Sequence, residues 1–154
     1  MNSAHLHLIF NHFPIIIPII GILVMIAGFI FRSAILKRTA FGLFILGALF
    51  TLPAFGTGED AEEVIEDLPG VEEKYIEEHE EAAETFAYLS YGLGVLSLFG
   101  IWASWKETSY SNIFTVILLF FALVVLAFAK ETGTTGGEIR HPEIREGFVQ
   151  AKTE

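Results

Sequence analysis

The sequence predicts an all-α, polytopic membrane protein: a four-helix transmembrane bundle with a short amphipathic external helix. Hydrophobic residues make up 53% of its 154 residues and charged residues only 18%, whereas about 25% of the residues in a soluble domain are charged. Four apolar runs interrupt an otherwise acidic chain. Because a domain usually has roughly 100–200 residues, we expect residues 1–154 to form a single domain.

Each apolar run approaches the length that a helix needs to cross a bilayer, which is about 20 residues. The first run carries no charge, and the second is bounded by Lys37-Arg38 and Thr57-Gly58. The second is short enough to be a buried core helix, but four such runs leave too little polar chain to cover them in water. The spans are therefore expected at about 13–31, 39–55, 85–105 and 109–129.

Basic residues mark the turns that should face the cytoplasm. Four of the nine Lys and Arg residues, but one of the nineteen acids, lie in the two turns that join spans one to two and three to four: Arg32, Lys37, Arg38, Lys106 and Glu107. By the positive-inside rule, both termini, the acidic segment 56–84 and the tail 130–154 lie outside. In a bacterium this predicts the inner (cytoplasmic) membrane, with both termini in the periplasm.

The outer segment has a helical pattern of its own. Apolar residues recur at helical spacing among the acids: Ala61, Val64, Ile65 and Leu68. Thr57 is the expected N-cap, and Pro69-Gly70 should end this amphipathic helix. The next acidic run, residues 72–84, has no helix breaker before span three, so we expect it to extend that helix out of the membrane.

The composition excludes several classes of partner and cofactor. The net charge is −10, which argues against nucleic acid because phosphate contacts require clustered Lys and Arg. The chain has no cysteine, which excludes a disulfide framework, a thiolate zinc site and an iron–sulfur cluster held by Cys. Any metal must be held by His, Met, carboxylate or backbone oxygen ligands.

All five histidines fall on the predicted outer side: His5, His7, His12, His79 and His141. His12 begins the first span, and His79 lies about one and a half turns before the uncharged part of the third. In an up-down-up-down bundle these two spans are diagonal partners, so His12 and His79 would project toward each other near the outer end. This geometry suits two axial ligands of a b-type haem, or two ligands of a smaller metal site. A histidine at a membrane interface can equally be an anchor, above all His5 and His7 in an expected flexible start.

The tail after the fourth span is predicted to be a loop. Residues 131–142 contain three glycines and no apolar periodicity, a pattern typical of a segment that folds back tightly. Such a loop would bring Glu138, Arg140 and His141 to the outer helix ends, where one could orient a ligand histidine or bind a metal directly. The candidate metal ligands are then His12, His79, His141, Glu80 and Glu138.

Short motifs occur along most of the chain: His12-Phe13-Pro14, Pro53-Ala54 with Thr57-Gly58-Glu59, His79-Glu80 with Ala83, and Thr132-Gly133 with Gly136-Gly137-Glu138-Ile139-Arg140-His141. Together they resemble a family of bacterial four-helix membrane proteins, catalogued as domain of unknown function 2231. Some members are fused to Rieske-type iron–sulfur domains, so the resemblance implies a redox setting with a suspected haem or metal. It favours His12 and His79, and to a lesser degree His141, over His5 and His7.

Three functions stay open from the sequence. The first is a small b-type cytochrome-like protein, with heme b on His12 and His79, that exchanges electrons with a periplasmic or membrane redox partner or a quinone. The second is a non-haem zinc or copper protein that also uses His141 and carboxylates such as Glu80 or Glu138. The third is a cofactor-free accessory or assembly subunit whose acidic face docks a basic partner. A homo-oligomer is compatible with each.

Enzymatic hydrolysis or group transfer is poorly supported by the sequence. It contains no Ser/His/Asp ordering, Gly-rich phosphate loop or H-E-x-x-H motif. Transport also has little support, because no ionisable residue lies inside a predicted span. Electron transfer or metal binding is therefore the expected kind of function.

Overall fold

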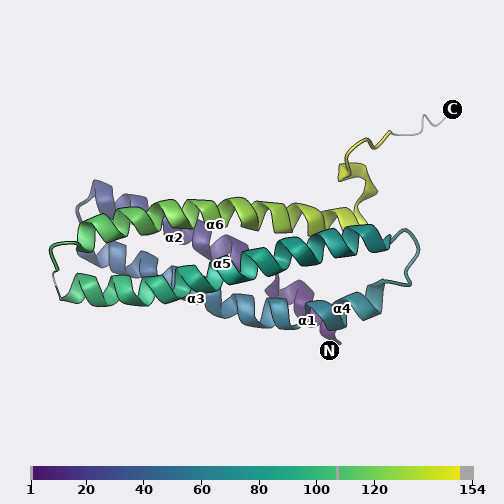
Figure 1. Cartoon of the computed structure of the whole chain (residues 1–154), viewed down its shortest axis with the longest axis horizontal. Helices are drawn as coiled ribbons and strands as arrows, with labels where there is room; N and C mark the ends of the chain where they lie inside the picture. The colour runs from purple at the N-terminus through teal and green to yellow at the C-terminus, as the bar shows by residue number, and fades with distance from the viewer. Residues whose placement is uncertain (1, 107, 150–154) are drawn as a thin grey trace.

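The structure, a computed structural model, describes residues 2–106 and 108–149. Glu107 of the second basic turn and the last five residues of the predicted outer tail lie outside the described residues. Within these ranges all regular elements are helical (Figure 1): α1 (Ser3–Phe10), α2 (Phe13–Ile30), α3 (Ala34–Gly56), α4 (Gly58–Ile65), α5 (Glu73–Trp105), α6 (Ser111–Arg140) and the 3-10 helix η1 (Pro142–Ile144).

The four long helices form an up-and-down bundle. Each packs against the next in the chain, and α6 returns to α2, so α2 and α5 lie diagonally opposite. The expected diagonal placement of the first and third spans is therefore confirmed. Large apolar side chains that are at most 1% exposed form the core: Met25, Phe41, Phe44, Leu93, Leu118 and Val125.

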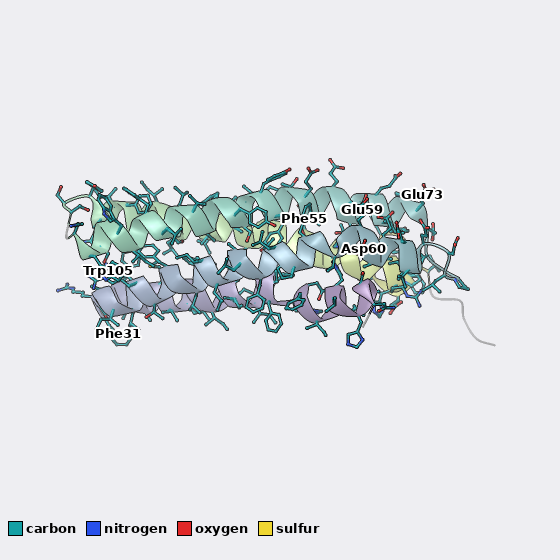
Figure 2. All side chains as sticks on the ribbon, turned by 90° about the horizontal axis from the view of Figure 1, so that it is seen from below. Phe31, Phe55, Glu59, Asp60, Glu73 and Trp105 are labelled. Carbon is teal, nitrogen blue, oxygen red and sulfur yellow. The ribbon has the colours of Figure 1, made fainter. Side chains whose placement is uncertain are left out.

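Four stretches of the bundle are long and apolar enough to cross a membrane: Ser3–Ile30, Ala34–Ile65, Glu73–Trp105 and Ser111–Arg140. Their outward faces are apolar as well, with large side chains that are more than 60% exposed: Leu23 at 62%, Ile30 at 70%, Val95 at 66% and Phe120 at 64%. Figure 2 shows Phe31 and Trp105 at one end of the bundle, and Glu59, Asp60 and Glu73 toward the other. Helices with such faces suit lipid, because a helix pairs its interior backbone groups within itself, except where Pro18 in α2 and Pro53 in α3 lack an N–H.

Two helices are longer than a bilayer requires. With 33 and 30 residues, α5 and α6 extend roughly 50 and 45 Å at 1.5 Å per residue, whereas a hydrocarbon core is about 30 Å thick. The acidic run 72–84 continues α5 beyond its apolar part, which confirms that prediction. At the same end of the bundle α1 packs against α4 (Figure 1). We call this end, formed by α1, α4 and the acidic ends of α5 and α6, the outer head, after the side on which the sequence predicts it.

The prediction of a loop after the fourth span is wrong, because residues 131–140 continue α6 as a helix. Each glycine costs about 1 kcal/mol in a helix interior, but at Gly136 a side chain would not fit: a Cβ there would lie 2.9 Å from Cε1 of His79. The hydroxyl of Thr132 donates to the Ala82 carbonyl on α5. Within α6, the hydroxyls of three threonines also donate to the backbone carbonyl four residues earlier: Thr132, Thr134 and Thr135. Packing against α5 thus outweighs the low helix propensity of the segment.

The start of the chain is helical rather than flexible, which corrects the expectation for His5 and His7. The Asn2 side chain accepts a hydrogen bond from the backbone N–H of His5 and caps α1. The Ser3 hydroxyl donates to the Asp60 carboxylate of α4 over 3.0 Å, and α1 also packs against α3. Tertiary contacts therefore order a helix of only eight residues, which would be marginal alone.

The amphipathic helix α4 is confirmed, although its N-terminus differs from the prediction. Thr57 precedes the helix, but its hydroxyl donates backward to the Pro53 carbonyl of α3 and makes no side-chain cap. The helix ends at Ile65, about a turn before Pro69-Gly70. Gly70 has a φ of +83°, a conformation that favours glycine, so the chain turns sharply here before α5.

Candidate functional site

His79 lies on the side of α5 that packs against α6. Its Nδ1 is 3.1 Å from Oγ1 of Thr135, and its ring rests on Gly136 so closely that a methyl group there would meet Cε1, Nδ1 and Nε2 within 3.4 Å. No described residue hydrogen-bonds to Nε2. Helix α6 thus holds one edge of the imidazole and leaves the second ring nitrogen free.

His7 caps the end of a helix with its side chain. Its Nδ1 is 3.0 Å from the Ala54 carbonyl, in the last turn of α3, where carbonyls lack partners within the helix. A carbonyl oxygen can only accept, so Nδ1 of His7 carries the proton and Nε2 keeps a lone pair. The Thr57 hydroxyl lies 3.3 Å from the same carbonyl. This arrangement leaves Nε2 of His7 without a hydrogen-bond partner among the described residues.

Both imidazoles are held in the neutral form. Burial is the main cause that lowers the pKa of His79, and the charge on His7 lowers it further, against smaller opposing effects of the Thr132 carbonyl and Glu80. Burial also lowers the pKa of His7, although the bond to Ala54 opposes it. Both histidines belong to the outer head, and the charge on His7 acts on His79 there. At pH 7 the pair therefore offers two neutral imidazoles, the form that binds metals.

Within the described residues, none of the other candidate ligands forms a hydrogen bond to His7 or His79, although the charge on Glu80 acts on His79. His5 and His12 are exposed, and His141 is exposed with its Nδ1 2.9 Å from the Glu143 carboxylate. Glu138 is half-buried on α6. Throughout residues 2–106 and 108–149, no group of three or more His, Asp or Glu side chains is placed to hold a metal ion. The sequence predicted His12 as the partner of His79; in the structure His12 is exposed, whereas His7, five residues earlier, is half-buried in the outer head.

Arg145 has a structural role that its place in the chain does not suggest. Its guanidinium lies over the Tyr75 ring, 3.8 Å from the centroid, and pairs with the Glu72 carboxylate. Its Nε donates to the Glu138 carbonyl over 2.8 Å, and the side chain is only 9% exposed. Arg145 therefore fastens the end of α6 to the start of α5, the two helices that hold His79. A contact across 73 residues leaves no local signal in the sequence.

Two carboxyl groups meet where α4 packs near α5. Glu62 hydrogen-bonds through its side chain to Glu80. This bond is the largest cause that raises the pKa of Glu62 to about 7, and burial and the repulsion from Glu80, Glu66 and Glu59 add to it. Below about pH 7 the two carboxyls therefore share a proton, and above it they repel each other.

The outer head is expected to loosen as the pH rises. A carboxyl whose pKa is about 7 when folded and 4.5 when unfolded contributes stability below pH 4.5 that is lost as the pH rises through 7. Amide hydrogen exchange in α4, corrected for the intrinsic rate, should be slower at pH 5 than at pH 8. In Glu62→Gln, which keeps a hydrogen-bonding side chain but cannot ionise, most of this difference should disappear. The exposed neighbour Glu63→Gln is the matched control, and an unchanged pH effect in Glu62→Gln would contradict the shared proton.

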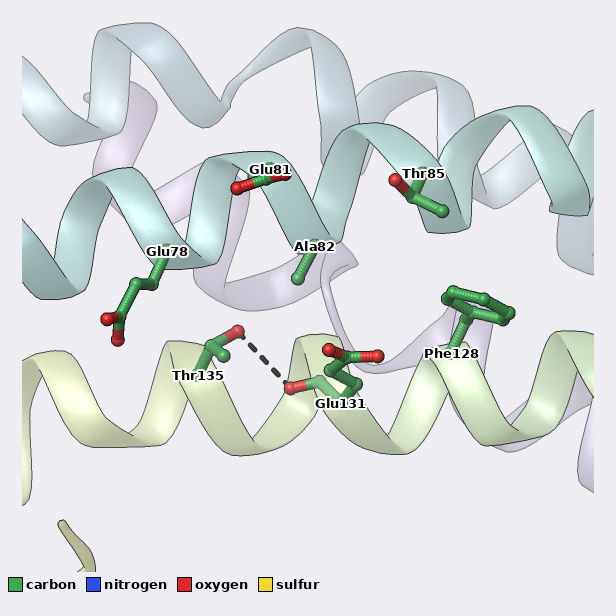
Figure 3. A pocket seen from close by; sticks show the side chains of 7 residues that line it. All are labelled: Glu78, Glu81, Ala82, Thr85, Phe128, Glu131 and Thr135. Carbon is green, nitrogen blue, oxygen red and sulfur yellow. Dashed lines mark hydrogen bonds between the residues drawn. The ribbon is translucent and has the colours of Figure 1, made fainter. Parts of the chain in front are cut away.

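An open acidic groove of about 480 Å³ lies between α5 and α6 (Figure 3). Seven residues line it: Glu78, Glu81, Ala82, Thr85, Phe128, Glu131 and Thr135. Thr135 borders this groove and also contacts His79. None of the lining residues is a histidine, so the groove and the imidazole pair are neighbouring but separate features.

The two neutral imidazoles are the groups of the outer head best suited to coordinate a metal. Each ring is fixed through Nδ1, and each has an Nε2 without a hydrogen-bond partner among the described residues. No family model matches the chain, and no match is found among the curated proteins or the solved structures. The chemistry is therefore argued from the residues of the site themselves.

Proposed function

We propose that the chain is a small b-type cytochrome-like membrane protein in which His7 and His79 are the axial ligands of a haem iron. The observation that carries the proposal is the pair itself: two neutral imidazoles, one from α1 and one from α5, with both Nε2 atoms unpartnered among the described residues. When bound, the haem would supply a reversible one-electron couple at the iron.

The number of ligands favours a haem over a bare metal ion. Structural zinc takes four protein ligands and catalytic zinc three, and no group of three His, Asp or Glu is placed for a metal among the described residues. A haem iron needs only axial ligands from the protein, because the porphyrin fills the other positions. Two imidazoles therefore fit haem iron better than they fit zinc or copper(II).

The surroundings of the two rings also suit a bound group. Because the ring of His79 rests on Gly136, it can accept a ligand only on the side away from α6. Asn11 follows His7 by one helical turn, and its buried Oδ1 has no hydrogen-bond partner among the described residues. A buried acceptor without a donor is costly, so a bound molecule or water that donates here would stabilise the outer head.

The proposed setting is the bacterial inner membrane, with the outer head in the periplasm. Arg32 and Lys106 lie in the α2–α3 and α5–α6 connections, and Lys37 and Arg38 lie near the start of α3. These connections are at the end of the bundle opposite the outer head (Figure 1), and short connections with such basic residues are normally cytoplasmic. Electrons would then pass between the head and a periplasmic partner or a membrane quinone.

A reduced-minus-oxidised absorption spectrum tests this function directly. The full chain, purified in detergent from cells supplied with haem, is expected to show sharp α and Soret bands at close to one haem per chain. A flat spectrum under haem-saturating conditions would overturn the proposal. Elemental analysis of the same sample would then reveal whether zinc or copper is bound instead.

A further inference from the structure

We propose that Thr135 is a positioning residue that fixes the proton of His79 on Nδ1 and so makes Nε2 its ligating nitrogen. Only the second half of this inference, that Nε2 is the atom that binds the metal, rests on the proposed function. The state of the ring itself is a property of the chain without any bound group.

The direction of the hydrogen bond follows from the partners of the Thr135 hydroxyl. This hydroxyl has one proton, and two carbonyl oxygens lie within 3.2 Å of it, those of Glu131 and Thr132 (Figure 3 shows the first). Carbonyl oxygens only accept, so they take the hydroxyl proton. Oγ1 is then left to accept, and the group 3.1 Å away that can donate to it is Nδ1–H of His79.

The fold holds the Thr135 hydroxyl in the orientation in which it accepts from Nδ1–H of His79. Its hydroxyl is tied to the carbonyl of its own helix four residues earlier, and the adjacent Gly136 is pressed against the His79 ring. A ring rotated by 180° would turn a carbon toward Oγ1 and lose the bond. Orientation of a ligand histidine through its second nitrogen is the usual task of a supporting residue around a metal centre.

His7 has the same arrangement, but a backbone carbonyl orients it. A carbonyl at the end of α3 cannot be removed by substitution without altering the helix, whereas the Thr135 hydroxyl can be. The support of His79 by Thr135 therefore depends on a side chain, beside the backbone hydrogen bond of the Thr132 carbonyl, whereas the support of His7 by Ala54 comes from the backbone.

The experiment compares three threonine variants of the full chain in detergent, labelled with nitrogen-15 histidine and recorded without haem. Long-range proton–nitrogen spectra distinguish the protonated from the unprotonated ring nitrogen, and His79→Gln assigns the signals. In the unsubstituted chain His79 should carry its proton on Nδ1. Thr135→Val should lower the ratio of the Nδ1-protonated to the Nε2-protonated form of His79 by about tenfold, roughly the effect of losing one hydrogen bond. Thr135→Ser should restore this ratio.

Thr134→Val is the matched control, because Thr134 is exposed and its hydroxyl bonds only to the Lys130 carbonyl of its own helix. If Thr135→Val folds poorly, Thr135→Ala removes the same hydroxyl with a better helix former. The proposal is overturned if removing the Thr135 hydroxyl leaves the ratio unchanged, or if Thr134→Val changes it equally.

A second readout separates this inference from the proposed function. In the haem-loaded protein, Thr135→Val should shift the midpoint potential while Thr134→Val leaves it in place. If no haem binds at all, the proposed function fails, but the nitrogen spectra still decide whether Thr135 sets the state of His79.

Discussion

Replacing His79 with alanine is expected to abolish the α and Soret bands of the purified protein. The substitution removes one of the two half-buried imidazoles of the outer head, and no described group of three His, Asp or Glu side chains is placed to take over the metal. His7→Ala should lose the bands or convert them to those of an iron with one axial ligand. The measurement is a reduced-minus-oxidised spectrum of each variant at equal protein concentration.

The controls for this series come from two of the three exposed histidines. His5→Ala and His12→Ala should keep the full spectrum, because neither side chain is buried in the outer head. His12 is the informative one, since the sequence alone predicts it as the partner of His79. If His12→Ala removes the bands while His7→Ala keeps them, the ligand pair proposed from the structure is wrong and the pair predicted from the sequence is right.

A loss of bands must also be separated from a loss of fold. His7 caps the orphan carbonyl at the end of α3, and such a cap contributes about 0.5–2 kcal/mol, so His7→Ala should unfold slightly earlier. His7→Gln keeps an N–H donor for the Ala54 carbonyl but cannot serve as a haem ligand of the same kind. Lost bands in His7→Gln with normal helix content would therefore show ligation rather than folding.

The bundle could be predicted from the sequence because its signals are local and strong. Four apolar runs give four long helices, since a chain in lipid must satisfy its backbone within each segment. The acidic run 72–84 contains no proline or glycine, and it continues α5 as expected. The diagonal placement of α2 and α5 follows from short connections between antiparallel neighbours.

The outer head could be predicted only in part, because its contacts join distant residues. His7 meets Ala54 across 47 residues, and His79 meets Thr135 across 56. The glycines after Ala129 indicate a loop by propensity, but in the structure Gly136 makes room for an imidazole. A pattern that is typical of a loop can therefore also mark a helix surface against which another side chain packs.

A large loss of thermal stability is expected when Gly94 is replaced, because α5 packs closely against α3 at this residue in the apolar part of the bundle. A Cβ at this position would lie 2.6 Å from Cβ of Ala48, and an alanine has no rotamer that could move aside. In Gly94→Leu the two helices must separate or shift, which should cost about 3 kcal/mol or more. Thermal unfolding in detergent, followed by circular dichroism, should show a Tm lower by about 10 °C.

Gly42→Leu provides the matched control, because Gly42 is exposed and a Cβ there would meet no described atom of another helix within 4 Å. It replaces glycine with a good helix former and should leave the Tm unchanged or higher. Gly94 lies fifteen residues from His79 along α5, which is roughly 22 Å, so Gly94→Leu should shift the unfolding temperature without altering the spectrum of the molecules still folded. If instead both leucine variants have the same Tm, α3 and α5 do not pack closely at this level.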